Sequence, residues 1–224
     1  MGGKTSPDMG GRDVHIPVGR VAVEGNLFIP PEARGIVIFA HGSGSSRFST
    51  RNQFVARELQ SDGLATLLCD LLTREEEEID QYTGSLRFDI GLLAGRLSDI
   101  TQWAATQQEI QHLAVGYFGA STGAAAALIA ETRNPGTVGA VVSRGGRPDL
   151  AGHALRRVQA PTLLIVGGND HQVIELNQQA MELLTATKEM VIVPGATHLF
   201  EEPGTLEAVA RLSSQWFQKY LNRS

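Results

Sequence analysis

The chain has 224 residues, 42% of them hydrophobic and 19% charged, with a formal net charge of −5 and one cysteine. This length suits one α/β domain, and the negative charge argues against a nucleic-acid surface. One cysteine excludes an internal disulfide framework, and no run approaches the roughly 18 apolar residues of a membrane span.

Residues 1–12 are rich in glycine and polar side chains, and we predict that they form a flexible tail before a single domain over residues 13–224. The tail contains no apolar stretch of the kind found in secretory signals. We therefore expect a cytoplasmic protein without membrane contact.

Two kinds of strand pattern follow the tail. Residues 13–18 and 21–30 alternate between apolar and polar side chains, which predicts an antiparallel pair joined near Gly19. The later runs are almost continuously apolar, as in strands buried on both faces of a parallel sheet. These runs are GIVIFAHG, LATLLCDLL, HLAVGYFGA, VGAVVSRGG, PTLLIVGGND and EMVIVPGAT.

Helical patterns separate the apolar runs. They cover residues 51–61, 89–108, 122–132, 173–185 and 205–221. Strands that alternate with helices predict an α/β fold, with a mostly parallel eight-stranded sheet and helices on both faces. The longest stretch that we predict to be irregular is 72–88, which follows a strand and so lies at the carboxyl edge of the sheet, where ligands bind.

One serine stands between such a strand and such a helix. Gly119 to Gly123 reads GASTG, a G-x-S-x-G pattern in which small residues allow a tight strand–turn–helix. Ser121 is thus a candidate nucleophile, exposed at the sheet edge with a helix N-terminus behind it. The alternative is that Ser121 only caps the helix, as serine often does.

A serine nucleophile needs a base, and the base needs an orienting acid. Of six histidines, His198 in VPGATHLF follows the last buried-type strand and is best placed to reach Ser121. Asp170 ends LLIVGGND and follows another strand, whereas its rivals Asp70 and Asp149 are less well placed. The sequence therefore predicts a triad of Ser121, His198 and Asp170.

An acyl-transfer site also needs donors for the oxyanion. One donor in such sites is the main-chain N–H after the nucleophile, here that of Thr122. The other is expected in the glycine-rich loop AHGSGSS, with Ser43 as first choice and Gly42 or Gly44 as alternatives. His41, at the start of this loop, is expected to hold it by side-chain hydrogen bonds.

Charged residues gather in the loops at the same edge. Glu75 to Glu78 form an acidic run, and Arg47, Arg144 and Arg147 lie in other loops of that edge. One interpretation is a solvated acidic loop. The other is that a glutamate such as Glu76 pairs with Arg47 or Arg144 and shapes the mouth of the pocket. The segment SRGGRPD, which bears Arg144 and Arg147, either favours an anionic ester or a phosphate-bearing partner or is only a turn between strand and helix.

Taken together, the motifs HGSGSSR, DLLTREEE, RFDIGLLAGRL, GASTGAAAAL, SRGGRPDLAG, GGNDHQV and GATHLFEEPG resemble the dienelactone hydrolase-like branch of the α/β-hydrolase superfamily. The similarity extends over residues 21–221, and the chain looks like small hydrolases that are sometimes fused to phosphoribosyltransferase domains. The resemblance implies Ser121 as nucleophile, His198 as base, Asp170 as acid, and main-chain donors at Thr122 and in the HGSG loop.

The resemblance also implies an activity. Dienelactone hydrolase itself uses a cysteine, and the serine here favours a serine carboxylesterase that acts on small esters. The segment 145–161 is too short for a large cap domain, and no metal or organic cofactor is expected. Two alternatives stay open: a lactone or thioester substrate, or a non-turnover accessory module of a phosphoribosyltransferase.

Overall fold

A mostly parallel sheet of eight strands organises residues 10–222, the part of the chain that the computed structural model describes. The strand order is β1-β2-β4-β3-β5-β6-β7-β8. The strands are β1 (Arg12–Val18), β2 (Val21–Phe28), β3 (Gly35–Ala40), β4 (Ala65–Cys69), β5 (Ala114–Ala120), β6 (Val138–Arg144), β7 (Thr162–Gly167) and β8 (Lys188–Val193). The predicted α/β fold is therefore confirmed.

The direction of the strands sets the position of the site. Strands β3 to β8 pair in parallel, whereas β1 and β2 form an antiparallel hairpin that joins the sheet through β4. The carboxyl ends of the parallel strands consequently meet at one edge, and the loops after β3, β5, β7 and β8 lie together there. Strand β1 begins at Arg12, one residue before the predicted start of the domain, and most of the predicted tail falls outside the described residues.

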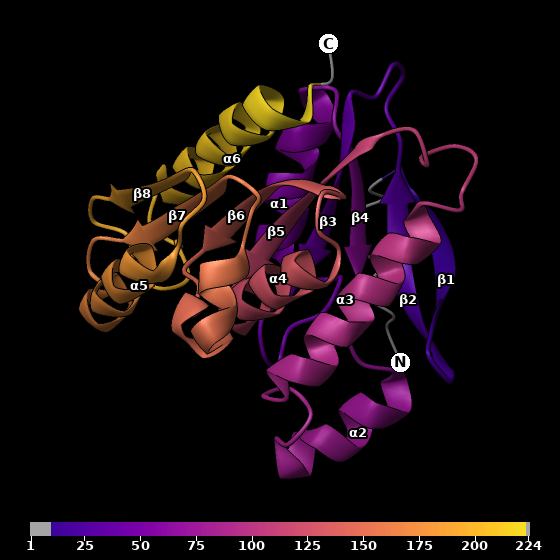
Figure 1. Cartoon of the computed structure of the whole chain (residues 1–224), viewed down its shortest axis with the longest axis horizontal. Coiled ribbons are helices and arrows are strands. Elements are labelled where there is room, and N and C mark those ends of the chain that lie inside the picture. Colours follow the sequence, from indigo (N-terminus) through magenta and orange to yellow (C-terminus); the bar gives the residue numbers. More distant parts are fainter. Residues whose placement is uncertain (1–9, 223–224) are drawn as a thin grey trace.

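Helices cover both faces of the sheet (Figure 1). They are α1 (Thr50–Ser61), α2 (Arg74–Thr83), α3 (Ile90–Ala104), α4 (Thr122–Arg133), α5 (His171–Leu183) and α6 (Thr205–Leu221), with a 3₁₀ segment η1 (Pro148–Arg157). Helices α3 and α4 pack on one face, and α1 and α6 pack on the other. No helix among residues 10–222 is long and apolar enough to cross a bilayer.

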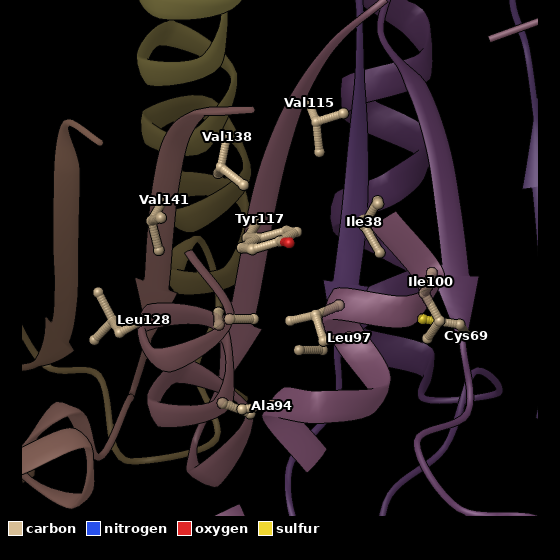
Figure 2. Packing of buried hydrophobic residues seen from close by; sticks show 14 of the residues in the cluster. Ile38, Cys69, Ala94, Leu97, Ile100, Val115, Tyr117, Leu128, Val138 and Val141 are labelled. Atoms are coloured by element: carbon tan, nitrogen blue, oxygen red, sulfur yellow. The ribbon is translucent and has the colours of Figure 1, made fainter. Parts of the chain in front are cut away.

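The core has one layer on each side of the sheet. Figure 2 shows the layer under α3 and α4, where Ile38, Leu97 and Val141 surround Tyr117. The Tyr117 ring is fully buried, and its hydroxyl lies 2.6 Å from the Thr101 hydroxyl, so this buried polar group has a hydrogen-bond partner. Both layers hold the sheet edge rigidly beneath the loops.

Helix α2 is the main departure from the prediction, which left residues 72–88 irregular. The Thr73 side chain accepts from the Glu76 N–H, and the Glu76 side chain accepts from the Thr73 N–H, so the helix begins with a capping box. It ends at Gly84, whose φ of 65° is left-handed. The acidic run is thus the first turn of a helix, where negative charge is favourable.

Helix α2 has little apolar packing. Of its residues only Asp80 is buried, and Figure 1 shows the helix beyond the end of α3, away from the sheet. Ion pairs attach it instead: Glu76 pairs with Arg96 of α3, and Asp80 pairs with Arg87. Its position therefore depends on charge more than on burial.

Candidate active site

Ser121 lies on the turn between β5 and α4, with φ of 51° and ψ of −122°. Few residues with a side chain adopt this conformation, because the Cβ atom is crowded by the backbone. The Ser121 side chain makes no capping hydrogen bond to α4. The capping interpretation is therefore wrong, and the strained turn leaves the hydroxyl free for another task.

The glycines of this turn are required by close packing. A Cβ atom on Gly123 would lie 2.2 Å from the main-chain oxygen of Ala40, and one on Gly119 would lie 2.5 Å from the Cα of Ala124. Neither contact is sterically possible without a shift of the backbone. The small residues of GASTG thus bring Ser121 against the end of β3.

The main chain of Ser121 is held from the next strand. Its N–H donates to the Arg144 oxygen at 3.2 Å, and its own oxygen accepts from the Arg147 N–H at 3.0 Å. Between these two arginines, Gly145 has a φ of 50°, and a Cβ atom there would lie 3.7 Å from His198 Cε1. The turn after β6 therefore contacts both the turn that bears Ser121 and the loop that bears His198.

Asp170 and His198 meet at the same edge. His198 Nδ1 lies 2.6 Å from Asp170 Oδ2, and the two side chains are 39% and 15% exposed. With Asp170 ionised, Nδ1 carries the proton and donates it to the carboxylate, which leaves the lone pair of Nε2 available as a base. No hydrogen bond joins Ser121 to His198 among the described residues, and catalytic contacts of this kind often tighten only when substrate binds.

The rival acids have other partners. Asp70 accepts from the Arg47 N–H at 2.7 Å and pairs with its guanidinium, and Asp149 pairs with Arg147 at 2.8 Å. Neither is hydrogen-bonded to a histidine.

His41 has the structural role expected of it. Its Nε2 accepts from the Leu71 N–H at 3.0 Å, and its Nδ1 lies 2.9 Å from the Gly42 oxygen. Burial lowers the pKa of His41, which keeps the ring neutral with the proton on Nδ1. The ring thereby fixes the start of the glycine-rich loop against β4.

The predicted oxyanion donors lie side by side. Thr122 is the first residue of α4, where main-chain N–H groups lack intrahelical partners. The Ser43 N–H donates to Thr122 Oγ1 at 2.9 Å, which the sequence did not suggest. The N–H of Ser43, one of the two predicted donors, is therefore already hydrogen-bonded to the side chain of Thr122.

The predicted pairing at the pocket mouth is wrong. Glu76 pairs with Arg96, not with Arg47 or Arg144, and its pKa is lowered mainly by the hydrogen bonds from Arg96. Arg47 instead pairs with Asp70 and Glu24. A capping box aims Glu76 back along its helix, and the predicted partners lie elsewhere.

Arg144 is buried rather than part of the mouth. The residue is 6% exposed, and its Nη2 donates to Asn52 Oδ1 at 3.2 Å. Burial, with repulsion from Arg51, lowers the pKa of Arg144 to about 10. Within residues 10–222 no carboxylate pairs with it.

A cavity of about 290 Å³ adjoins the glycine-rich loop. Gly42 to Ser46 form one wall, and α2 with its flanks forms the other. The lining side chains outside the loop are His41, Leu72, Glu77, Asp80, Gln81, Arg87 and Leu93. A Cβ atom on Gly42 would lie 3.0 Å from Ser121 Cβ, so Gly42 separates the cavity from Ser121, which does not itself line it.

This wall of the cavity was not predicted, because residues 72–88 were predicted to be irregular and α2 was not foreseen. The sequence does contain the signals of a helix. Thr73 and Glu76 have the spacing of a capping box, and Gly84 directly follows the ten residues of α2. A second cavity of about 490 Å³ lies on the other side of Ser46, Leu72 and Glu77, next to the β1–β2 hairpin.

Comparisons with known proteins agree with this architecture. The crystal structure of dienelactone hydrolase from Anabaena variabilis is 62% identical, has a TM-score of 0.93, and matches over 94% of this chain and 98% of its own. Est1E from Butyrivibrio proteoclasticus has a TM-score of 0.77 over 92% of this chain and 98% of its own, but at 14% identity it shows the shared fold alone.

Curated relatives are longer than this chain. Two Mycobacterium tuberculosis proteins are 56% identical over 215 residues and carry phosphoribosyl transferase as a provisional name. The match covers 96% of this chain but 48% of theirs, so the chain spans about half the length of these relatives. The family model for the dienelactone hydrolase family matches residues 23–222, and the chain therefore belongs to that family.

Proposed function

We propose that this chain hydrolyses small carboxylic esters through an acyl-enzyme on Ser121, with His198 as general base and Asp170 as the orienting acid. One observation carries the proposal. The Asp170–His198 hydrogen bond lies at the same sheet edge as a strained serine whose hydroxyl does not cap its helix. Membership of a hydrolase family supports the class of reaction.

The mechanism follows from these positions. His198 Nε2 takes the proton of the Ser121 hydroxyl as the oxygen attacks the ester carbonyl, and Asp170 stabilises the imidazolium that forms. The tetrahedral oxyanion accepts hydrogen bonds from the main-chain N–H of Thr122 and from that of Ser43, which turns to it from Thr122 Oγ1 as the charge develops. His198 then protonates the leaving alcohol, and water repeats the sequence to release the acid.

Serine in place of cysteine makes the base more important. A thiol is partly ionised near neutral pH, whereas a serine hydroxyl needs a general base to become nucleophilic. The Asp170–His198 pair supplies that base. A serine esterase is accordingly favoured over the dienelactone reaction for which the family is named.

The test is turnover of p-nitrophenyl acetate by the wild type and by Ser121→Ala. We expect the variant to lose at least about 10⁴-fold in kcat while its circular dichroism is unchanged. Activity retained by the folded variant would refute the assignment. A panel of lactones and thioesters separates these substrates from simple esters, since all would share the nucleophile.

The second candidate is an accessory module without turnover that serves a phosphoribosyltransferase. The length and the name of the Mycobacterium tuberculosis relatives favour it. A fluorophosphonate probe distinguishes the two candidates, because only an activated serine reacts. Labelling of the wild type but not of Ser121→Ala supports the enzyme, and absence of labelling supports the module.

A further inference from the structure

The cavity beside the glycine-rich loop has an unbalanced negative charge. Asp80 and Arg87 both line it but neutralise each other through an ion pair at 2.6 Å. His41 lines it as a neutral ring, because burial lowers its pKa. The remaining charged side chain in the lining is that of Glu77.

Neighbouring cations are committed elsewhere. Arg47 pairs with Asp70 and Glu24, and Arg74 pairs with Glu78 at 3.5 Å. Within the described part of the chain, the Glu77 carboxylate has no hydrogen-bond or ion-pair partner, although the residue is partly buried. Burial and the nearby Asp70 raise the pKa of Glu77 by more than the charges of Arg47 and Arg87 lower it, so the ionised carboxylate is not fully compensated by these paired arginines.

Glu77 also stands between two cavities. It lines the 290 Å³ cavity beside the glycine-rich loop and the 490 Å³ cavity, which Glu24 and Asp70 also line together with the paired Arg47 and Arg74. A substrate group in either cavity therefore lies in a space that this carboxylate lines. In a partly desolvated cleft, a charge of this kind discriminates strongly between ligands of opposite sign.

The basic segment after β6 does not compensate. Arg144 is buried and bonded to Asn52, and Arg147 is paired with Asp149. Neither lines the two cavities. The positions of the Arg144 and Arg147 side chains thus do not support the anionic substrate that these two residues suggested.

We infer that Glu77 is a specificity-determining residue that selects esters with a cationic group, such as an ammonium, over esters with a carboxylate or phosphate. The inference rests on the proposed esterase function, and it concerns the part of the substrate that occupies the α2 side of the cleft. The volume of about 290 Å³ limits that part of the substrate to a small charged group.

Two series of esters test the inference. In the first the charge is on the alcohol: acetylcholine, its neutral isostere 3,3-dimethylbutyl acetate, and 4-acetoxybutanoate. In the second the charge is on the acyl group: p-nitrophenyl esters of 4-(trimethylammonio)butanoate, 5,5-dimethylhexanoate and glutarate. Two series are needed because either the acyl or the alcohol part can lie in the cavity.

In one series, wild-type kcat/KM should favour the cation over the anion by about ten-fold or more. Glu77→Gln should abolish this preference with less than about two-fold change for the neutral ester, and Glu77→Lys should reverse it. The matched control is Glu182→Gln, which removes an exposed carboxylate of α5 that lines neither cavity. Its preference should equal that of the wild type.

The inference is overturned if neither series shows a preference, or if Glu77→Gln and Glu182→Gln change it equally. Failure of the esterase proposal looks different, because the wild type then turns over none of the six esters. In that event the folded Ser121→Ala protein still tests the charge preference through calorimetric titration with acetylcholine and 3,3-dimethylbutyl acetate. Equal affinity for the two would refute it.

Discussion

The main-chain N–H of Ser43 donates to the side-chain oxygen of Thr122 at 2.9 Å. This bond ties the glycine-rich loop to the first residue of α4 and so fixes the position of the loop beside Thr122. It also engages the Ser43 N–H, which must leave or share this bond before it can donate to an oxyanion.

Thr122→Val should therefore lower kcat/KM for p-nitrophenyl acetate by about five- to twenty-fold, because the valine keeps the shape but loses the acceptor. Thr122→Ser keeps the hydroxyl and should stay within about two-fold of the wild type. If the valine variant is as active as the serine variant, the loop is positioned without this bond.

The conformation of Ser121 predicts an unusual order of stability. At a φ of 51° an alanine keeps the strain of the turn, whereas a glycine does not. Ser121→Gly should have a free energy of unfolding about 1 kcal/mol higher than Ser121→Ala, by urea denaturation. The control is Gln178 in α5, where the alanine variant should be the more stable one by about 1 kcal/mol.

Replacement of two buried arginines, Arg96 and Arg144, should change the free energy of unfolding in opposite directions. Arg96 pairs with Glu76 and donates to the Leu71 oxygen, whereas within residues 10–222 the Arg144 side chain has only the Asn52 amide oxygen as a hydrogen-bond partner. Arg96→Met strands a carboxylate and should destabilise the fold by about 2 kcal/mol.

Arg144→Met removes a desolvated charge without an acid partner and should raise the free energy of unfolding by about 1 kcal/mol. Chemical denaturation of both variants at neutral pH measures the two signs. Destabilisation by both would mean that the packing of the Arg144 stem outweighs the desolvation of its charge.

Acid should loosen α2. The hydrogen bonds from Arg96 hold the pKa of Glu76 below its ordinary value, so the ionised carboxylate stabilises the folded state at pH values above about 4.3. That contribution is lost as the pH falls through the lower, folded-state pKa. Amide protection of residues 74–83, corrected for the intrinsic exchange rate, should decline as the pH falls below about 4.3.

Glu76→Gln should show weaker protection of the same residues at neutral pH and a shallower decline with acid. Asp80 has a pKa that burial would raise but that the hydrogen bonds from Arg87 and the main chain lower, and it accounts for the remaining slope. An unchanged slope in Glu76→Gln would assign the whole effect to Asp80.

Much of the sheet could be predicted from the sequence because its signals are local. Continuous apolar runs marked the parallel strands, and helix α6 matches its predicted range of 205–221. The positions of Asp170 and His198 followed from the rule that loops after parallel strands share an edge.

The pairing of charges could not be predicted in this way. Glu76 reaches Arg96, twenty residues later, because a helix turns the acidic run towards α3. Missing the capping box meant missing the helix, and with it the cavity wall that bears Glu77. The sequence thus predicts which residues lie at the shared edge of the sheet. It does not predict their ion-pair partners, because these depend on side-chain directions that the helix sets.

The sparse attachment of α2 has an evolutionary consequence. A ten-residue helix with one buried residue can change at its exposed positions without disturbing either core layer, as long as Glu76 still pairs with the buried Arg96. The α2 wall can consequently change in evolution independently of the edge that bears Ser121, Asp170 and His198. Substitutions in α2 alone could then alter substrate preference while the fold stays the same.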